Sequence, residues 1–244
     1  MATTTKTWTP EALEAVAAEL EPQGPEATLQ WMVDNFHPSL YLACSFQQEE
    51  SVLLHMLSKI QPDARAFYLD TDFLFPETYE TRDVFALTWP SIKFERYHNL
   101  TPEQQAAEHG DKLWEREPGE CCNIRKVEPL KRALGEVDAW ITGVRRDQAP
   151  TRANTKKVEW DGKFGLVKAS PLADWSLDDV WNYIKANDVP YNPLHDRNFP
   201  SIGCTYCTRP VMPGEDPRAG RWADQDKTEC GLHPSEAEAK AESK

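Results

Sequence analysis

The chain has 244 residues, of which 40% are hydrophobic and 27% are charged, a length that fits one or two globular domains. Its 27 lysine and arginine residues face 40 aspartate and glutamate residues, and the net charge of -13 argues against general binding of nucleic acids or anionic membranes. No apolar run approaches the roughly 20 residues that cross a bilayer, and residues 1–10 lack a signal-peptide pattern. We therefore expect a soluble, cytoplasmic protein.

Short apolar runs, typical of strands, alternate along the chain with stretches of helical periodicity. Helices are predicted over residues 11–20 and 26–36, from 52 to 57, from Pro76 onward, and over 127–134. Strands are predicted at 40–44, 66–69, 92–97 and 139–144. This alternation predicts an α/β fold, with a mostly parallel twisted sheet and helices on both faces.

Three polar segments follow predicted strands, at 45–51, 70–75 and 145–152. Ligands of such sheets bind at the carboxyl ends of the strands, so we expect these segments to converge on one crevice. Beyond residue 190 the sequence is irregular and rich in proline, glycine and arginine. We predict one domain over 1–234 and a flexible, disordered, charged tail over 235–244.

The six cysteines are too few and too unevenly placed for a disulfide scaffold. Cys121 and Cys122 are adjacent, and Cys204 and Cys207 form a second pair. The second pair alone fits a redox dithiol or half of a zinc site. Adjacent cysteines reach one zinc ion awkwardly, so the four thiols favour an iron-sulfur cluster, with zinc or unrelated thiols as the alternatives.

The remaining cysteines have different surroundings. Cys230 lies near the end of the chain, where a surface thiol is the ordinary interpretation. A mobile segment would also suit a nucleophile that meets first a substrate and then a protein partner. Cys44 ends an apolar strand and is expected to be a small buried hydrophobic residue.

Basic residues gather near the same segments as the thiols. Any one of them could be solvated surface, but together they suggest a site for a phosphate or sulfate group, because guanidinium groups match the geometry of these anions. They are Lys126, Arg145, Arg146, Arg152, Arg209, Arg218 and Arg221.

Several segments together resemble the assimilatory adenylylsulfate (APS) reductases, relatives of the phosphoadenylylsulfate (PAPS) reductases, from about residue 41 to residue 233. The segments are LDTDFLFPET (69–78), CCNIRKVEPL (121–130), GVRRDQAPTR (143–152), IGCTYCTRP (202–210) and ECGLH (229–233), with the loop that begins at Ser45.

The resemblance implies a fold like that of the adenine nucleotide α-hydrolases, of PP-loop type. It implies thioredoxin-dependent reduction of APS to sulfite and AMP through an S-sulfocysteine on Cys230, with thioredoxin or a glutaredoxin-like dithiol protein as the partner. It is also compatible with a homo-oligomer. One 4Fe-4S cluster would be held by Cys121, Cys122, Cys204 and Cys207. Lys126 and His233 would act with Cys230. The substrate would be bound by Ser45, Gln47, Asp70, Thr71, Arg145, Arg218 and Arg221.

The segment 45–51 departs from the glycine-rich loop of the related ATP pyrophosphatases, because it contains no glycine. This weakens the alternative of an ATP-consuming ligase or sulfurtransferase. Two further alternatives are reduction of PAPS, alone or together with APS, and a zinc-stabilised nucleotide-binding or interaction module. The cluster is expected to have a structural and electrostatic role.

Overall fold

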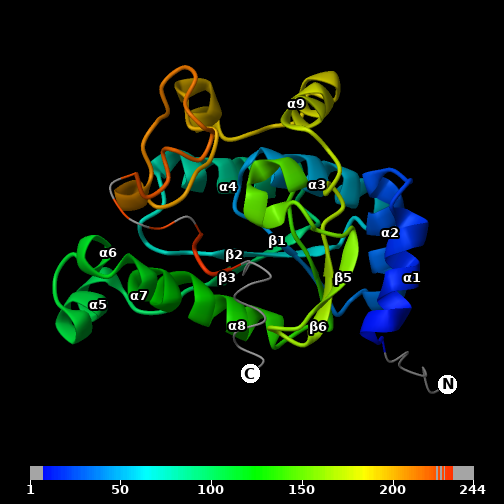
Figure 1. Ribbon diagram of the computed structural model, residues 1–244, viewed down its shortest axis with the longest axis horizontal. Helices are drawn as coiled ribbons and strands as arrows, with labels where there is room; N and C mark the ends of the chain where they lie inside the picture. Colours follow the sequence, from blue (N-terminus) through cyan, green and yellow to red (C-terminus); the bar gives the residue numbers. More distant parts are fainter. Residues whose placement is uncertain (1–7, 224, 226, 228, 233–244) are drawn as a thin grey trace.

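The computed structural model describes residues 8–223, 225, 227 and 229–232. Within these residues six strands form one sheet, and helices cover both of its faces (Figure 1). The strands are β1 (Leu40–Ala43), β2 (Arg65–Leu69), β3 (Lys93–Tyr97), β4 (Ala139–Ile141), β5 (Val158–Asp161) and β6 (Leu166–Ala169). The helices are α1 (Pro10–Leu20), α2 (Pro25–Phe36), α3 (Gln48–Ile60), α4 (Pro76–Thr88), α5 (Pro102–His109), α6 (Leu113–Arg116), α7 (Pro118–Cys122), α8 (Glu128–Leu134) and α9 (Leu177–Ala186).

The strands are hydrogen-bonded in the order β3-β2-β1-β4-β6-β5. Neighbours run parallel except β5, which pairs antiparallel with β6 at the edge. The predicted α/β fold with a mostly parallel sheet is therefore confirmed. In this order β4 lies beside β1. The segments that follow β1 and β4 therefore diverge toward opposite sides of the sheet, and a crevice forms at the carboxyl ends of the two strands.

Both faces of the sheet are buried, as expected for parallel strands between helical layers. Leu40 and Leu42 of β1 belong to one core, which residues of α2, α3, α4 and α9 complete. Tyr41, between them, points to the other face and packs with Phe67, Trp140 and residues of α8. Successive residues of β1 therefore pack against opposite layers of helices, as in a strand buried on both faces.

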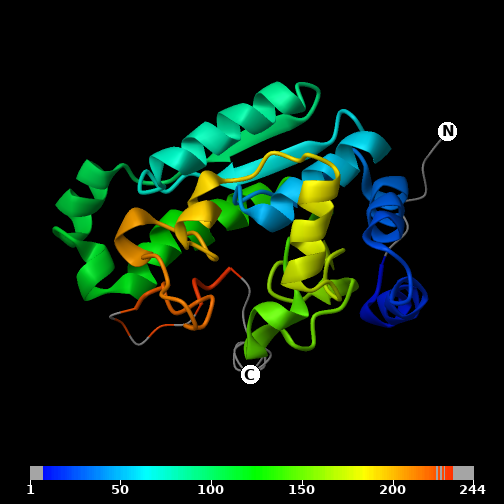
Figure 2. The same ribbon diagram turned by 90° about the horizontal axis from the view of Figure 1, so that it is seen from above.

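Helices also close the two ends of the molecule. α1 and α2 lie at one end, where α1 contacts the edge strand β5, and α5, α6 and α7 lie at the opposite end (Figures 1 and 2). A π-helix, Asn123–Val127, joins α7 to α8. Single π-turns of this kind are frequent at functional sites, because the wider turn redirects side chains.

The polar segment predicted between the first strand and the next helix is partly helical. The segment covers 45–51 and the helix is predicted to begin at 52, but α3 already begins at Gln48. Polar residues form its first turn because they find partners there: Glu50 Oε2 accepts hydrogen bonds from Ser45 Oγ at 2.7 Å and from Gln47 N at 3.2 Å. A local capping interaction between Gln47 and Glu50 thus starts the helix within a segment whose polarity suggests an exposed turn.

The hairpin β5–β6 is missing from the sequence-based description. Each strand has four residues, too short for a clear pattern. The turn is built by Asp161, whose Oδ1 accepts hydrogen bonds from the backbone of Lys163 at 3.1 Å and Phe164 at 3.3 Å, and by Gly165 with φ +71°. The fourth predicted strand also ends early, at Ile141.

Beyond residue 190 the described chain has no strand or helix other than short 3-10 turns, at Pro193–Arg197 and Thr205–Cys207. The predicted tail over 235–244 and His233 lie outside the described residues, so the division into one domain and a tail stays a prediction. Among the residues that the structure describes, no helix is long and apolar enough to cross a membrane.

Candidate active site

A cavity of about 340 Å³ opens at the carboxyl ends of β1, β2 and β4. Its walls include Ser45 after β1, Thr71 after β2 and Gly143 after β4. The segments 200–203 and 216–222 close it from the irregular part of the chain. The three strand-end segments therefore converge on one crevice, as their positions in the sequence predict.

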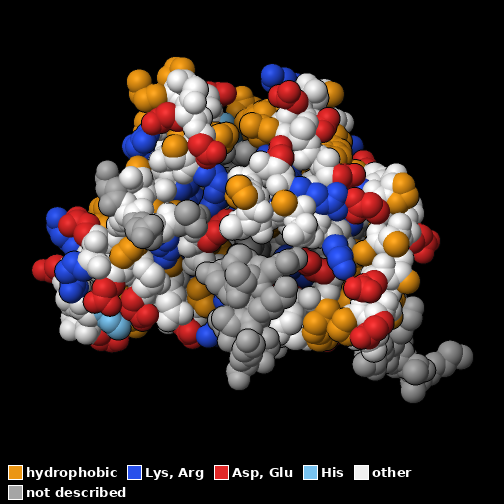
Figure 3. Space-filling model, in the orientation of Figure 1, with side chains coloured by type: hydrophobic (Ala, Val, Ile, Leu, Met, Phe, Trp, Pro, Cys, Tyr) orange, Lys and Arg blue, Asp and Glu red, His pale blue; other side chains and the backbone are white. Residues whose placement is uncertain are grey.

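In Figure 3 a group of Lys and Arg side chains is visible above and to the left of the centre of the view. Five cationic side chains from distant parts of the chain line the cavity: Lys126, Arg145, Arg152, Arg218 and Arg221. Two other basic residues predicted in this group point elsewhere: Arg146 binds Glu21 at 2.6 Å, and Arg209 binds Glu215 at 2.9 Å.

Buried contacts fix the guanidinium groups of the cavity in place. Arg145 Nε donates to Glu49 Oε1 at 3.0 Å, and both side chains are at most 5% exposed. Arg221 Nη1 donates to Ser201 Oγ and to Ile202 O, each at 3.2 Å. Burial lowers the pKa of Arg218, which Glu229 partly offsets, and an arginine remains charged even so. The guanidinium groups of the cavity are therefore held in fixed positions, as an anion-binding site requires.

Lys126 lies in the π-helix and reaches both the cavity and the cysteines. Burial acts to lower the pKa of its ammonium group. Electrostatic interaction with nearby cysteine sulfurs, foremost those of Cys204 and Cys230, outweighs burial and holds the pKa of Lys126 above its usual value. Lys126 therefore stays charged next to both Cys230 and the four paired cysteines.

The four paired cysteines line a second, smaller cavity beside the first: Cys121, Cys122, Cys204 and Cys207. All are free thiols. Burial, together with the fields of neighbouring thiolates, raises the pKa of Cys121 to about 12 and that of Cys207 to about 11. Within the described part of the chain, no three His, Cys, Asp or Glu side chains are arranged to hold a single metal ion.

The surroundings of these thiols suit an anionic group bound by them. Arg125, whose side chain is 1% exposed, lines the same cavity, and its Nε donates to Gln105 Oε1 at 2.7 Å. Its Nη2 is buried with no hydrogen-bond partner among the described residues. Thr71 Oγ1 lies 3.3 Å from Cys204 Sγ. A buried unpaired cationic donor beside four thiols fits a cluster of iron and sulfide held by thiolates.

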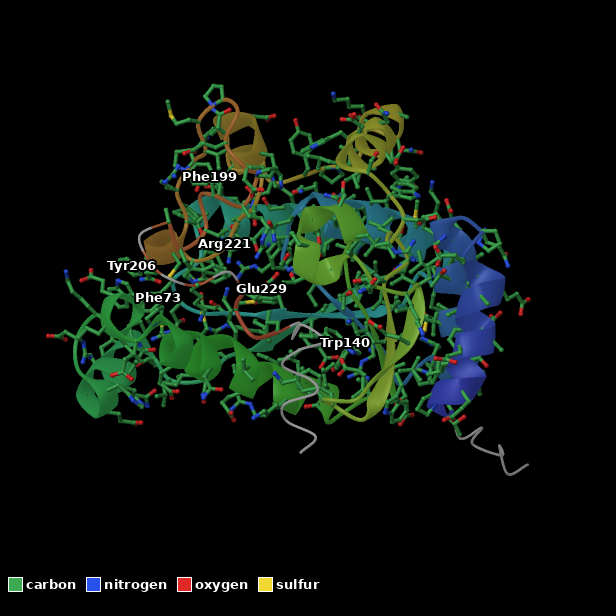
Figure 4. The ribbon with its side chains drawn as sticks, viewed as in Figure 1. Phe73, Trp140, Phe199, Tyr206, Arg221 and Glu229 are labelled. Atoms are coloured by element: carbon green, nitrogen blue, oxygen red, sulfur yellow. The ribbon has the colours of Figure 1, made fainter. Side chains whose placement is uncertain are left out.

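Aromatic rings cover the thiol cavity. Trp114 and Tyr206 are stacked with centroids 4.0 Å apart, and Phe73 contacts both rings. Figure 4 shows Phe73 and Tyr206 next to one another. The aromatic layer keeps the thiols out of water, which is one reason why their pKa values are high.

The predicted nucleotide-binding residues lie in two different settings. Ser45, Gln47 and Thr71 line the large cavity, and Gln47 Oε1 accepts a hydrogen bond from Ile202 N at 2.7 Å. Asp70 is absent from the cavity wall: its carboxylate accepts hydrogen bonds from Tyr79 Oη at 2.7 Å and Arg96 Nε at 2.6 Å. Asp70 therefore orders the loop after β2.

The predicted nucleophile also reaches the large cavity. Cys230 is half-buried and lines it, together with Glu229 and Leu232. The predicted partner His233 lies outside the described residues, and its role stays a prediction.

The profile of the phosphoadenosine phosphosulfate reductase domain matches residues 39–210. The chain belongs to this family. A relative from Halalkalibacterium halodurans named adenosine 5'-phosphosulfate reductase is 46% identical over 91% of this chain and 96% of its own length. One from Gloeobacter violaceus named phosphoadenosine 5'-phosphosulfate reductase is 49% identical over 91% and 93%. The phosphoadenylyl-sulfate reductase of Candida auris, solved as a phosphate complex, is similar in structure, with TM-score 0.74, 32% identity, and coverage of 84% of this chain and 100% of that chain.

Three residues of this candidate site are not predicted from the sequence: Glu49, Gly143 and Glu229. Glu49 holds Arg145, and Glu229 binds Arg152 and Arg218. In an acidic chain, carboxylates are usually interpreted as exposed surface residues. The one signal in the sequence is that Glu49 and Glu229 lie in segments that also contain predicted site residues. Gly143 is needed because a Cβ there would lie 2.7 Å from the Cβ of Glu49.

Proposed function

We propose that the chain reduces adenylylsulfate to sulfite and AMP. The observation that carries this proposal is one half-buried thiol, Cys230, in a cavity lined by cationic side chains at the carboxyl ends of a parallel sheet. The relatives that bear the name adenosine 5'-phosphosulfate reductase support the choice of substrate.

The chemistry would proceed in two transfers. The Cys230 thiolate attacks the sulfur of the sulfate group, the bond from sulfur to the bridging oxygen breaks, and AMP leaves with the electron pair. Cys230 then holds an S-sulfonate. Bringing two anions together is the electrostatic difficulty, and Lys126, with Arg145, Arg218 and Arg221, would stabilise the charge that builds up in the transition state. Ser45, Gln47 and Thr71 would hold the nucleotide.

Sulfite release needs two electrons from a dithiol protein. A thiolate of the partner attacks Cys230 Sγ, sulfite leaves with the electron pair, and a mixed disulfide forms. The second thiol of the partner resolves this disulfide and regenerates Cys230. We propose thioredoxin, or a glutaredoxin-like protein, as the partner, and a reducing cytoplasm as the location, since such a compartment keeps free thiols reduced.

We also infer that Cys121, Cys122, Cys204 and Cys207 bind one 4Fe-4S cluster. A cube offers each thiolate a separate iron, which adjacent cysteines can reach, and Arg125 would donate toward its sulfides. When bound, the cluster would supply a fixed charged group that anchors both cysteine pairs next to Lys126. Support comes from the common cavity of the four thiols and the unpaired Arg125 Nη2.

The cluster is tested on protein purified without oxygen. We expect about four irons and four acid-labile sulfides per chain, and broad visible absorption that the variant Cys204→Ser loses. Stoichiometric zinc and a colourless protein would contradict the cluster and would favour the zinc alternative.

Reduction of PAPS is the second candidate, because a relative and a solved structure that resemble the chain carry that name. Sulfite release is measured with each nucleotide in the presence of thioredoxin. Turnover of APS with a kcat/KM well above that for PAPS supports the proposal, and the reverse ratio contradicts it. The variant Cys230→Ser should lose turnover with either nucleotide while its visible absorption stays unchanged.

A further inference from the structure

We propose that Glu229 is a positioning residue whose carboxylate holds the Cys230 segment in the cavity by binding Arg152 and Arg218. The inference rests on the proposed function, in which Cys230 is the nucleophile. It adds a residue that acts on the reaction by positioning Cys230, and its contact with Arg218 also orients one of the arginines proposed to face the substrate.

Donors from two distant segments meet at the carboxylate of Glu229. Oε2 accepts from Arg152 Nη2 and from Arg218 Nη2, each at 3.2 Å. Oε1 accepts from Arg152 Nε at 3.3 Å and from Thr151 Oγ1 at 3.4 Å. Both oxygens are therefore used, by the loop after β4 and by the irregular segment near the end of the chain.

The ion pairs are shielded from water. The side chains of Arg152, Arg218 and Glu229 are 13%, 19% and 12% exposed. Ion pairs of exposed side chains contribute little, because water and salt screen them, whereas a carboxylate enclosed between two guanidinium groups leaves buried charge behind when it is removed. Glu229 thus has the environment of a specific contact.

The next residues continue the attachment. Lys163 Nζ donates to the carbonyl of Gly231 at 3.1 Å, and Leu232 packs against the core that contains Tyr41 and Trp140. Gly231 has φ +85°, which lets the chain turn between these contacts. Cys230 therefore lies between an ionic contact on one side and a backbone and apolar contact on the other.

Charge and length both favour glutamate at this position. One carboxylate faces two guanidinium groups, so positive charge remains for an anionic substrate in the same cavity. An amide in its place would offer one acceptor oxygen and turn an NH₂ group toward a guanidinium. Aspartate keeps the charge but is one methylene shorter, so it reaches fewer of the donors.

An ionic attachment is also reversible, which suits the second half of the reaction. A partner thiol must reach Cys230 after the first transfer, so the segment has to leave the cavity. Local openings of this kind are drawn from weakly held parts of a structure, and contacts between charges can be broken without loss of the core.

The experiment measures how fast iodoacetamide alkylates Cys230 in the full-length, cluster-containing protein. Trypsin releases residues 228–240 as a peptide with one cysteine, so mass spectrometry follows this thiol alone. We expect alkylation of Glu229→Gln and Glu229→Ala to be at least about fivefold faster than in the parent, with Glu229→Asp between them. In the parent, the rate should rise with salt, and in Glu229→Ala it should be nearly independent of salt.

The matched control is Glu159→Gln, which removes a partly exposed ion pair with Lys168 on the sheet edge and should leave the rate unchanged. Turnover provides the second readout: Glu229→Gln should lower kcat more than it raises KM, and Glu229→Asp should recover part of the loss. Equal alkylation rates in the parent, Glu229→Gln and Glu229→Ala would overturn the inference. Full turnover in Cys230→Ser would instead overturn the proposed function, and the alkylation rates would still test the contact.

Discussion

The carboxylate of Glu50 shows how burial changes the protonation of an acidic side chain. Glu50 lines the cavity and is 7% exposed. Burial, followed by the nearby charge of Glu49, raises its pKa to about 7, against the opposing hydrogen bonds from Ser45 and from the Gln47 backbone. Near neutral pH this side chain is therefore partly protonated, which limits the negative charge in an anion site.

The raised pKa of Glu50 predicts a pH dependence of stability. Between its unfolded value of 4.5 and about 7 the folded state keeps a proton that the unfolded state releases, so the free energy of unfolding falls as pH rises through this window. The variant Glu50→Gln does not lose stability in this way, because an amide does not titrate in this pH window. We expect the difference in unfolding free energy to move in favour of Glu50→Gln by roughly 2 kcal/mol between pH 5 and pH 8. Urea unfolding at several pH values measures it, and a constant difference would contradict it.

Gly203 gives a second prediction at this scale. A Cβ on Gly203 would lie 2.5 Å from Arg221 Nη2 and 2.7 Å from its Cζ, so Gly203→Ala should push the guanidinium out of the cavity. Because the displaced group is the end of a flexible side chain, we expect little loss of stability and a fall in kcat/KM for APS of about tenfold or more, the size of a lost charge-assisted hydrogen bond.

The variant Arg221→Ala provides the comparison for Gly203→Ala. If both act on the same guanidinium, the double variant should lose much less than the product of the two single losses. Fully multiplicative losses, or a fall in melting temperature that accounts for the lost activity, would rule out this explanation.

At the level of elements, the site depends on the close approach of β4 to the first turn of α3. A Cβ on Gly143 would lie 2.7 Å from Glu49 Cβ and 2.5 Å from Glu50 Oε1. The alternation of strands and helices is predictable from the sequence because both faces of the parallel strands are buried. The start of α3 and the hairpin β5–β6 are not: the polar first turn of α3 is buried in part because Glu49 binds the distant Arg145, and the strands of the hairpin are too short for a clear pattern.

Gly143→Ala should therefore damage the fold itself. We expect a loss of about 1–3 kcal/mol in the free energy of unfolding, since the Cβ of Glu49 belongs to a helix and cannot move aside alone. Gly162→Ala is the matched control, because a Cβ there meets no atom within 4 Å. Equal stabilities of the two variants in urea would show that β4 and α3 tolerate the extra methyl group.

On the scale of the whole molecule, a chain with a net charge of -13 brings five cationic side chains to one crevice, and three of them are paired there with carboxylates. The crevice is assembled from loops after β1, β2 and β4 and from the last described residues, Glu229 to Leu232. The sequence predicts which loops meet, through the topology of parallel sheets, and it identifies the thiols. It does not predict that Asp70 accepts hydrogen bonds from Tyr79 and Arg96, or that Glu229 forms ion pairs with two arginines. Such pairings depend on three-dimensional contacts between separate segments.

The most direct test of the account is to incubate the cluster-containing protein with APS in the absence of any thiol reductant. The account predicts release of one AMP per chain and a gain of one SO₃ group on the tryptic peptide that contains Cys230, removed when reduced thioredoxin is added. A peptide without added mass while AMP is formed, or the same mass on another cysteine, would contradict it.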